Sequence, residues 1–190
     1  MNLGKLLEDS GAILKGHFIL TSGRHSDTYF EKFRVLERPD VLSALCTEIA
    51  GRYASEPIEY VAGPTTGGII IAFEVARQMA LPAVYVETEG GKKALRRGKT
   101  LPAGAKVLVV DDVLTTGTSL IETREAIEGA GGVVQAFAVL IDRSPPELDL
   151  GKPVFASYKV KAVSYAPDEI PEWLAQIPAV KPGTRAPAAR

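Results

Sequence analysis

The sequence predicts an α/β fold with a mainly parallel central sheet flanked by helices. Between residues 39 and 141, short apolar runs rich in β-branched residues alternate with longer amphipathic runs, which is typical of strands joined by helices. Strands that alternate with helices imply parallel pairing through right-handed crossovers. No repeat or linker divides the 190 residues, so residues 1–177 are expected to form a single domain.

The N-terminal segment predicts one helix followed by two short strands. Apolar residues between positions 3 and 14 recur at helical spacing, and Gly11 or Gly16 ends the helix. The strands, at residues 17–20 and 28–30, are joined around a Ser-Gly-Arg turn.

The remaining elements follow the alternation that predicts the sheet. Pro39 suits the first turn of a helix that continues to Tyr53. A strand at 60–62 then ends at a glycine-rich turn. The further elements expected are a helix at 68–80, strands at 83–87 and 106–110, a helix at 119–130 and a strand at 133–141. The pattern weakens beyond Val160, and residues 178–190, rich in proline, alanine and basic residues, are expected to form a mobile tail.

Composition and charge exclude several classes of protein. The net charge of −1 argues against general binding to nucleic acid, which needs a positively charged face. No apolar run approaches the ~18 residues of a membrane span, and the N-terminal residues lack the pattern of a signal peptide. Cys46, the single cysteine, lies in an apolar-periodic stretch and is interpreted as a small buried residue. A cytoplasmic protein without nucleic-acid or membrane partners is therefore expected.

The segment from Val107 to Ser119 is the most informative in the chain. A buried strand ends in the paired carboxylates Asp111 and Asp112, and a hydroxyl-rich turn containing Gly117 leads into the next helix. Backbone N–H groups at the start of a helix favour an anion such as phosphate, and hydroxyl groups add donors. The acidic pair suits a polyol, alone or with a divalent cation. Phosphate and diol together are the chemistry of a ribose 5-phosphate.

This segment resembles the signature of the type I phosphoribosyltransferases, which bind 5-phosphoribosyl 1-pyrophosphate (PRPP). The resemblance implies the type I phosphoribosyltransferase fold, with a flexible loop and a small N-terminal hood to which residues 1–35 contribute. It also implies that the acidic pair holds the ribose hydroxyls and that the following loop holds the 5-phosphate. The residues expected to bind PRPP are Asp111, Asp112, Val113, Leu114, Thr115, Thr116, Gly117, Thr118 and Ser119, with Thr66 and Gly67 of a second turn. An ordinary strand-to-helix turn is the alternative.

The second turn, from Gly63 to Gly68, also joins a strand to a helix. Such a turn brings backbone N–H groups close to an anion, although taken alone it is equally consistent with a tight connection. It resembles the pyrophosphate loop of the family, in which many members carry Tyr-Lys where this chain has Thr66-Gly67, a replacement that leaves backbone contacts. A lysine that many members carry before the Ser-Gly-Arg turn is Thr21 here, so its contact to PRPP is absent or supplied differently.

Between Glu87 and Gly104 lies a segment too long for a plain connection, with clustered cations beside glycines. This combination fits a lid that closes over a pyrophosphate leaving group and neutralises it; a solvated basic loop is the alternative. The family has a flexible catalytic loop of this kind, whose cation often reaches the neighbouring subunit's site. The residues expected to be catalytic are Lys92, Lys93, Arg96 and Arg97 of the lid, with Asp111 and Asp112. The spacing does not select one cation among the four.

Base recognition is expected from three other places in the chain. Residues 18–30 resemble the N-terminal segment of orotate phosphoribosyltransferases, in which the Ser-Gly-Arg turn and the aromatic residues after it pack against the pyrimidine. Tyr29 and Phe30 match those aromatics. Arg143 matches an arginine that the family places near orotate, and a guanidinium can donate two parallel hydrogen bonds to a carboxylate. An ordinary surface arginine is the alternative. Thr115 matches the loop residue that the family uses toward orotate.

The resemblance therefore implies transfer of phosphoribosyl from PRPP to orotate, giving orotidine 5′-monophosphate and pyrophosphate in pyrimidine (UMP) biosynthesis. It implies a homodimer, and Mg²⁺ that bridges PRPP oxygens with few direct protein ligands, Asp111 and Asp112 being the candidates. One alternative is another phosphoribosyltransferase, for adenine or xanthine, which shares the PRPP half. The other is a PRPP-binding regulator without turnover, whose usual basic surface or DNA-binding domain is not expected from this length and charge.

Overall fold

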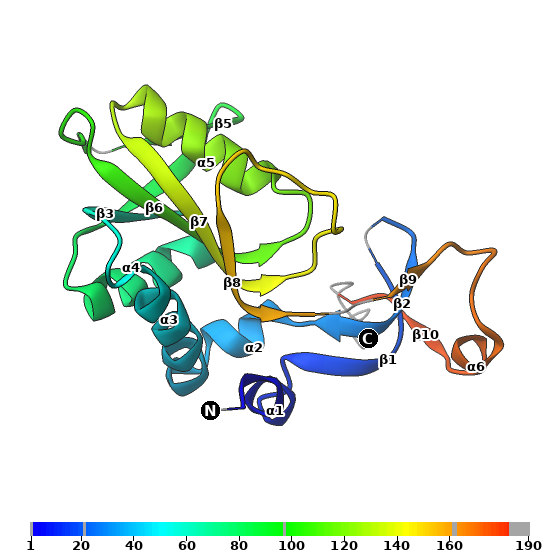
Figure 1. Cartoon of the computed structure of the whole chain (residues 1–190). Helices are drawn as coiled ribbons and strands as arrows, with labels where there is room; N and C mark the ends of the chain where they lie inside the picture. The colour runs from blue at the N-terminus through cyan, green and yellow to red at the C-terminus, as the bar shows by residue number, and fades with distance from the viewer. Residues whose placement is uncertain (1, 21, 97, 161–162, 183–190) are drawn as a thin grey trace, which may run out of the picture.

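The computed structural model describes residues 2–20, 22–96, 98–160 and 163–182, and the strands of this part form two sheets. The larger sheet carries the helices of the predicted alternation, and the smaller one lies beside it (Figure 1). Ligands of open α/β sheets collect in the crevice at the carboxyl ends of the strands.

The larger sheet has the strand order β5-β4-β3-β6-β7-β8. Its strands are β3 (Tyr60–Pro64), β4 (Ala83–Glu89), β5 (Lys92–Leu95), β6 (Lys106–Leu114), β7 (Val133–Asp142) and β8 (Val154–Lys159). All neighbouring pairs run parallel except β4 and β5, which are antiparallel. The mainly parallel sheet is thus confirmed, and it places the carboxyl ends of β3, β6 and β7 along one edge.

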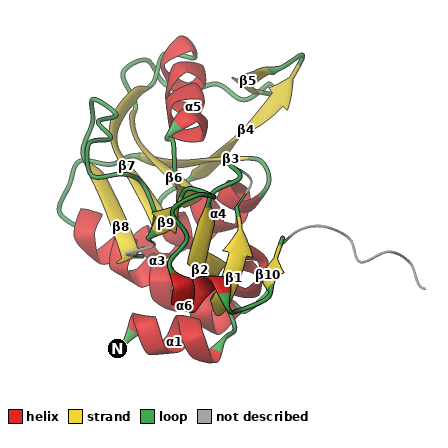
Figure 2. Cartoon of the chain, turned by 90° about the vertical axis from the view of Figure 1, so that its right-hand side faces the viewer, coloured by secondary structure: helices red, strands yellow, loops and turns green. Residues whose placement is uncertain are grey.

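Helices cover both faces of this sheet. α3 (Pro39–Tyr53) and α4 (Gly67–Met79) pack on one face and α5 (Thr118–Gly129) on the other (Figures 1 and 2). Alternate residues of β6 divide between the two cores, since successive side chains of a strand point to opposite faces. β6 is therefore buried between two layers, which fixes the position of its carboxyl end. No helix among the described residues is long and apolar enough to span a bilayer.

The smaller sheet joins segments from the two ends of the chain. Its strands are β1 (Ile13–Ile19), β2 (His25–Phe30), β9 (Ser164–Tyr165) and β10 (Ala179–Val180), in the order β10-β1-β2-β9. We call this sheet the hood, together with α1 (Leu3–Asp9), α2 (Lys32–Leu36) and α6 (Glu172–Ala175). Figure 2 shows β10 alongside β1, with α6 beneath them. The hood therefore contains residues far beyond the N-terminal 35.

Some local predictions were wrong. The first helix ends at Asp9, and residues 13 and 14 begin β1, because Ile13 pairs with Phe30 across the hairpin and this pairing outweighs helical spacing. The segment after Glu87 is not one long loop, since β4 and β5 form a hairpin there. Within the segment 178–190, residues 179–180 pair with β1, whereas residues 183–190 lie outside the described part of the chain.

Candidate functional site

The paired carboxylates lie at the carboxyl end of β6, and each is only 8% exposed. Asp111 accepts hydrogen bonds from the Ser119 hydroxyl (2.7 Å) and from the backbone N–H of Asp112 (2.9 Å). Asp112 accepts one from the backbone N–H of Val113 (2.7 Å) and one from Lys32 Nζ (2.9 Å). These bonds fix both side chains, and the second lone pair of each oxygen stays available to a hydroxyl group.

The electrostatics of this pair depend on two lysines. Burial raises the pKa of Asp111, the charge of Asp112 raises it further, and the Ser119 hydrogen bond and the charge of Lys93 oppose this. Burial lowers the pKa of Lys32, but its hydrogen bond to Asp112 and the nearby carboxylates outweigh burial, so the pKa lies above its usual value. Lys32 is therefore an ammonium ion that balances the charge of Asp112.

The loop after β6 has the geometry of an anion cradle. Thr115 and Thr116 are exposed, and Gly117 has a φ of 79°. A Cβ on Gly117 would displace the methyl groups of Leu150, and the positive φ favours glycine at this position. α5 begins at Thr118 without a side-chain cap, which leaves the N–H groups of its first turn available to a phosphate.

Ser119 and Lys93 act behind this loop. Ser119 donates its hydroxyl hydrogen to Asp111, and Lys93 Nζ donates to the hydroxyl (2.7 Å) and the carbonyl oxygen (2.9 Å) of Ser119. Lys93 also lies 3.5 Å from Glu122, and its side chain is 9% exposed. The structure thus directs the Ser119 hydroxyl to Asp111, whereas the sequence predicts that it contacts the phosphate.

The other predicted lid cations are Lys92, Arg96 and Arg97. Lys92 lies exposed on β5 and Arg96 directly follows that strand, while Arg97 lies outside the described residues. Neither Lys92 nor Arg96 lines the cavities described below. Among the lid residues that the structure describes, Lys93 is connected to the paired carboxylates through Ser119.

The second turn, between β3 and α4, meets the first at Asp112. A Cβ on Gly67 would lie 2.5 Å from Asp112 Oδ2, so the carboxylate fills the space of a side chain there. Thr66 precedes α4 without a side-chain cap. A cavity of about 520 Å³ adjoins this turn and is lined by Lys32, Phe33, Leu36, Glu37, Thr65, Thr66, Gly67 and Ile70. Both predicted phosphate turns thus face one site.

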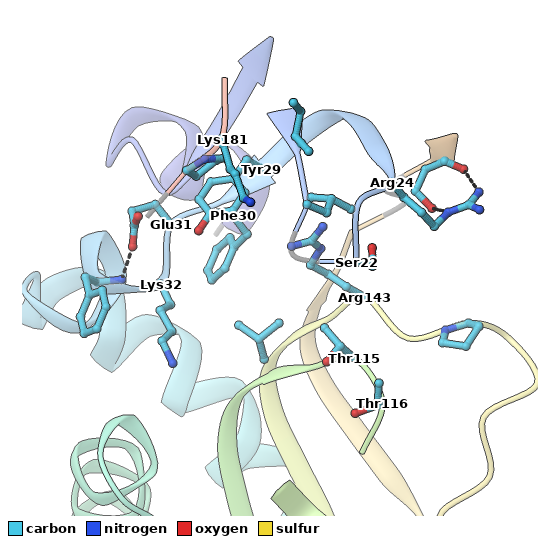
Figure 3. Close-up of a pocket in the computed structure, with 17 residues that line it drawn as sticks. Ser22, Arg24, Tyr29, Phe30, Glu31, Lys32, Thr115, Thr116, Arg143 and Lys181 are labelled. Atoms are coloured by element: carbon cyan, nitrogen blue, oxygen red, sulfur yellow. Dashed lines mark hydrogen bonds between the residues drawn. The ribbon is translucent and has the colours of Figure 1, made fainter. Parts of the chain in front are cut away.

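A larger cavity of about 970 Å³ lies between the hood and the sheet edge (Figure 3). It is lined by all four residues predicted to recognise the base: Tyr29 and Phe30 from β2, Thr115 from the phosphate loop and Arg143 after β7. The backbone N–H of Arg143 donates to the carbonyl oxygen of Leu114 (2.9 Å), which ties the base side of the site to the phosphate loop. Segments distant in sequence therefore form one pocket.

The charge of this pocket favours an anionic ligand. Among the described residues that line it, the cations Arg24, Lys32, Arg143 and Lys181 outnumber the one carboxylate, Glu31. Burial lowers the pKa of the Arg143 guanidinium, and the nearby Tyr29 opposes this shift. Burial also raises the pKa of the Tyr29 phenol, so the hydroxyl group keeps its proton. The pocket therefore combines a planar cation, an aromatic face and a phenol donor.

Two of these cations were missed by the sequence reasoning. Lys32 follows the aromatic pair Tyr29-Phe30 by two residues, and that proximity is the only sequence signal for it. Lys181 reaches the pocket because β10 pairs with β1, where His17 lies opposite Ala179. His17 also holds this segment through a bond from its Nδ1 to the carbonyl oxygen of Ile177 (2.9 Å). No local pattern predicts such a long-range placement.

Comparison with known proteins gives consistent matches. Residues 42–169 match the family model described as the phosphoribosyl transferase domain. An orotate phosphoribosyltransferase of Pelotomaculum thermopropionicum is 47% identical over 180 residues, which covers 95% of each chain. One of Desulforamulus reducens is 44% identical over 176 residues, covering 93% of this chain and 92% of the relative.

Solved structures agree with these matches. The crystal structure of orotate phosphoribosyltransferase from Aeropyrum pernix has a TM-score of 0.71 at 32% identity, covering 84% of this chain and 94% of that one. The adenine phosphoribosyltransferase of Thermoanaerobacter pseudethanolicus has a TM-score of 0.60 at 19% identity, covering 70% of this chain and 88% of that one, and shares the fold.

Proposed function

The chain belongs to the phosphoribosyltransferase family and groups within it with the orotate phosphoribosyltransferases, and from this premise we propose how its site works. Its activity is the transfer of phosphoribosyl from PRPP to orotate, which gives orotidine 5′-monophosphate and pyrophosphate in pyrimidine biosynthesis. The observation that carries the assignment of the site is the pocket in which Tyr29, Phe30, Thr115 and Arg143 adjoin the phosphate loop.

The ribose 5-phosphate of PRPP binds to the β6–α5 segment in this proposal. The 5-phosphate accepts hydrogen bonds from the N–H groups at the start of α5 and from the exposed hydroxyls of Thr115, Thr116 and Thr118. The two ribose hydroxyls donate to Asp111 and Asp112, whose side chains are already fixed by other bonds. Preformed partners of this kind lower the cost of ordering the site when the substrate binds.

Orotate occupies the larger cavity in this proposal. Arg143 donates to its carboxylate or imide oxygens, and the aromatic rings of Tyr29 and Phe30 pack on the pyrimidine. Phe18 supports this surface, because its ring lies 5.6 Å from that of Tyr29. A neutral purine would leave the half-buried guanidinium of Arg143 without an anion, which selects for orotate.

The transfer requires positioning and charge stabilisation more than acid–base chemistry. A ring nitrogen of orotate forms a bond to C1 of the ribose while the bond from C1 to pyrophosphate breaks, and pyrophosphate leaves with the electron pair. Positive charge develops on the ribose ring in this step, and Asp112 lies where its carboxylate can stabilise that charge. Holding the two substrates in line supplies a further large part of the acceleration.

The carboxylate oxygens of Asp111 and Asp112 also fit the Mg²⁺ that accompanies PRPP in this family. Mg²⁺ prefers oxygen ligands and keeps several waters, so two carboxylates beside a phosphate ligand suffice. Asp111 and Asp112 would hold the ion together with oxygens of PRPP, and the bound ion would supply positive charge next to the leaving pyrophosphate. Removing divalent ions with EDTA should abolish turnover, and added Mg²⁺ should restore it.

A homodimer in the cytoplasm completes the proposal. Phe33, Ile70 and Phe73 are 61%, 42% and 63% exposed, and two of them line the cavity beside the second turn. Exposed aromatic and aliphatic side chains that adjoin a site suit the face of a second copy of the chain. Sedimentation should give twice the monomer mass, and a Phe73→Asp variant should sediment as a monomer.

Charged substrates such as PRPP do not cross membranes, so cell fractionation should find the protein with them in the cytoplasm.

The test of the function is the loss of the near-ultraviolet absorbance of orotate when PRPP and Mg²⁺ are added, with adenine and xanthine as parallel substrates. Turnover of orotate alone is the expected result. Turnover of adenine or xanthine would transfer the proposal to another phosphoribosyltransferase. Binding of PRPP without turnover of any base would indicate a regulator instead.

A further inference from the structure

Lys32, at the start of α2, lies where the two cavities of the site meet. It lines both the base pocket and the cavity beside the second turn. Figure 3 shows its side chain extending from the hood away from Tyr29 and Phe30, on the side of the pocket opposite Arg143. Its ammonium group is 2.9 Å from Asp112 Oδ2, while its side chain is 43% exposed. A cation at this place adjoins the predicted positions of base, ribose and pyrophosphate together.

The second turn brings no cation of its own to pyrophosphate. Its residues are glycine, proline and threonine, so its contribution to an anion is backbone N–H groups and hydroxyls. Of the described residues that line the adjoining cavity, Lys32 and Glu37 are the charged ones. Glu37 is already paired with Arg34 at 3.1 Å. A pyrophosphate bound there would therefore have Lys32 as its cationic partner.

Gly67 explains why this cation comes from α2 and not from the turn. A Cβ at position 67 would lie 2.5 Å from Asp112 Oδ2, so a lysine could not be accommodated there without moving the carboxylate. Lys32 Nζ contacts that same oxygen atom. The ammonium group thus occupies the surroundings of Asp112 that a side chain on the turn would otherwise enter.

We propose that Lys32 is the residue that binds the pyrophosphate group of PRPP, in place of the lysines that this chain lacks at positions 21 and 67. This proposal rests on the proposed function. In the structure Lys32 balances Asp112, and in this proposal the ammonium group turns to the pyrophosphate oxygens when the ribose hydroxyls bind to Asp112. The flexible four-carbon stem permits this movement. Because negative charge develops on pyrophosphate as it leaves, Lys32 also favours the transition state.

The test is to measure pyrophosphate binding by calorimetry, and the KM values for PRPP and orotate, in Lys32→Gln and Lys32→Met variants. Loss of a charge-assisted contact should weaken pyrophosphate binding and raise the KM for PRPP by about ten- to a hundredfold. The KM for orotate should change by less than about threefold, because Arg143 still faces the base. Lys32→Arg should recover part of the loss. If the methionine variant fails to fold, pyrophosphate binding by the glutamine variant alone tests the proposal, because glutamine keeps a hydrogen-bond donor toward Asp112.

Lys159→Met is the matched control. Lys159 pairs with Asp142 at 3.4 Å, and the Asp142 side chain is 13% exposed against 12% for Asp112, so both variants remove a lysine from a nearly buried aspartate. The control should leave pyrophosphate binding unchanged. Unchanged pyrophosphate affinity in both Lys32 variants would overturn the proposal, as would equal weakening of pyrophosphate and orotate with a lowered melting temperature. Absence of orotate turnover by the wild-type protein would refute the proposed function alone, since calorimetry with pyrophosphate still reports on Lys32.

Discussion

The half of the site that faces ribose phosphate comes largely from one continuous segment, residues 111–119, whereas the half that faces the base draws on β2, the end of β7 and β10. The first half lies on a strand buried between two helical layers, and Asp111 and Asp112 accept hydrogen bonds from backbone N–H groups next to them in sequence. The second half is held by strand pairing between the two ends of the described chain. The difference predicts that changes in the two halves will affect different kinetic constants.

The largest effect is expected from Asp112→Asn, which alters the first half. The charge that would stabilise the developing cation is lost, so kcat should fall by about a hundredfold or more. Stability should change little, because Lys32, the partner of Asp112, is partly exposed and stays hydrated. Steady-state kinetics and a thermal melt of the same preparation check this. A melting temperature that falls in proportion to the rate would contradict the assigned role.

Arg143→Gln should affect the second half alone. The amide keeps a donor but loses the charge and the two parallel hydrogen bonds, so the KM for orotate should rise by about tenfold or more. The KM for PRPP should stay within about twofold, since no residue of the phosphate loop changes. Measuring the KM values for orotate and for PRPP in the same variant shows which half of the site the substitution affects. A matching rise in both would contradict the assignment of the Arg143 side chain to the base half alone.

A smaller effect is expected from the C-terminal part of the hood. Removing residues 178–190 deletes β10, which pairs with β1, and also Lys181, which lines the base pocket. The KM for orotate should rise by about two- to fivefold, with little change for PRPP, because one screened, exposed charge contributes modestly. Lys181→Gln in the full-length chain separates the charge from the strand. Full affinity for orotate in the truncated chain would exclude this segment from the base half.

The same contrast explains what could be predicted from the sequence. Pro39 and the apolar alternation give α3 and the parallel sheet, and Asp111 with Gly117 gives the phosphate loop, because these signals are local in sequence. The start of β1 could not be distinguished from a helix, since its strand identity depends on pairing with β2. The place of Lys181 in the base pocket could not be predicted either, since it depends on the pairing of β10 with β1. Lys93 was predicted as a lid cation, but its place on Ser119 depends on how the hairpin packs against α5.

The smallest effect on activity is expected from Glu74→Gln, in the scaffold beneath the second turn. Glu74 joins α4 to α3 by accepting hydrogen bonds from Arg77 (2.8 Å), Ser43 (2.7 Å) and Gln78 (2.7 Å). The bond from Arg77, with those from Ser43 and Gln78, lowers the pKa of Glu74 from 4.5 to about 2, against the effect of burial. A lowered folded-state pKa means that ionised Glu74 stabilises the fold above pH 4.5, and that this stabilisation is lost as the pH falls toward 2.

The free energy of unfolding of Glu74→Gln should therefore be lower than that of the wild type by about 1 kcal/mol at pH 7, a value reduced because Arg77 is largely exposed. The difference should shrink between pH 4.5 and pH 2, where wild-type Glu74 takes up its proton. Urea denaturation at several pH values measures it. Both KM values should stay unchanged at pH 7, because neither half of the site contains Glu74. A changed KM for PRPP with an unchanged one for orotate would show that the position of α4 sets the second turn.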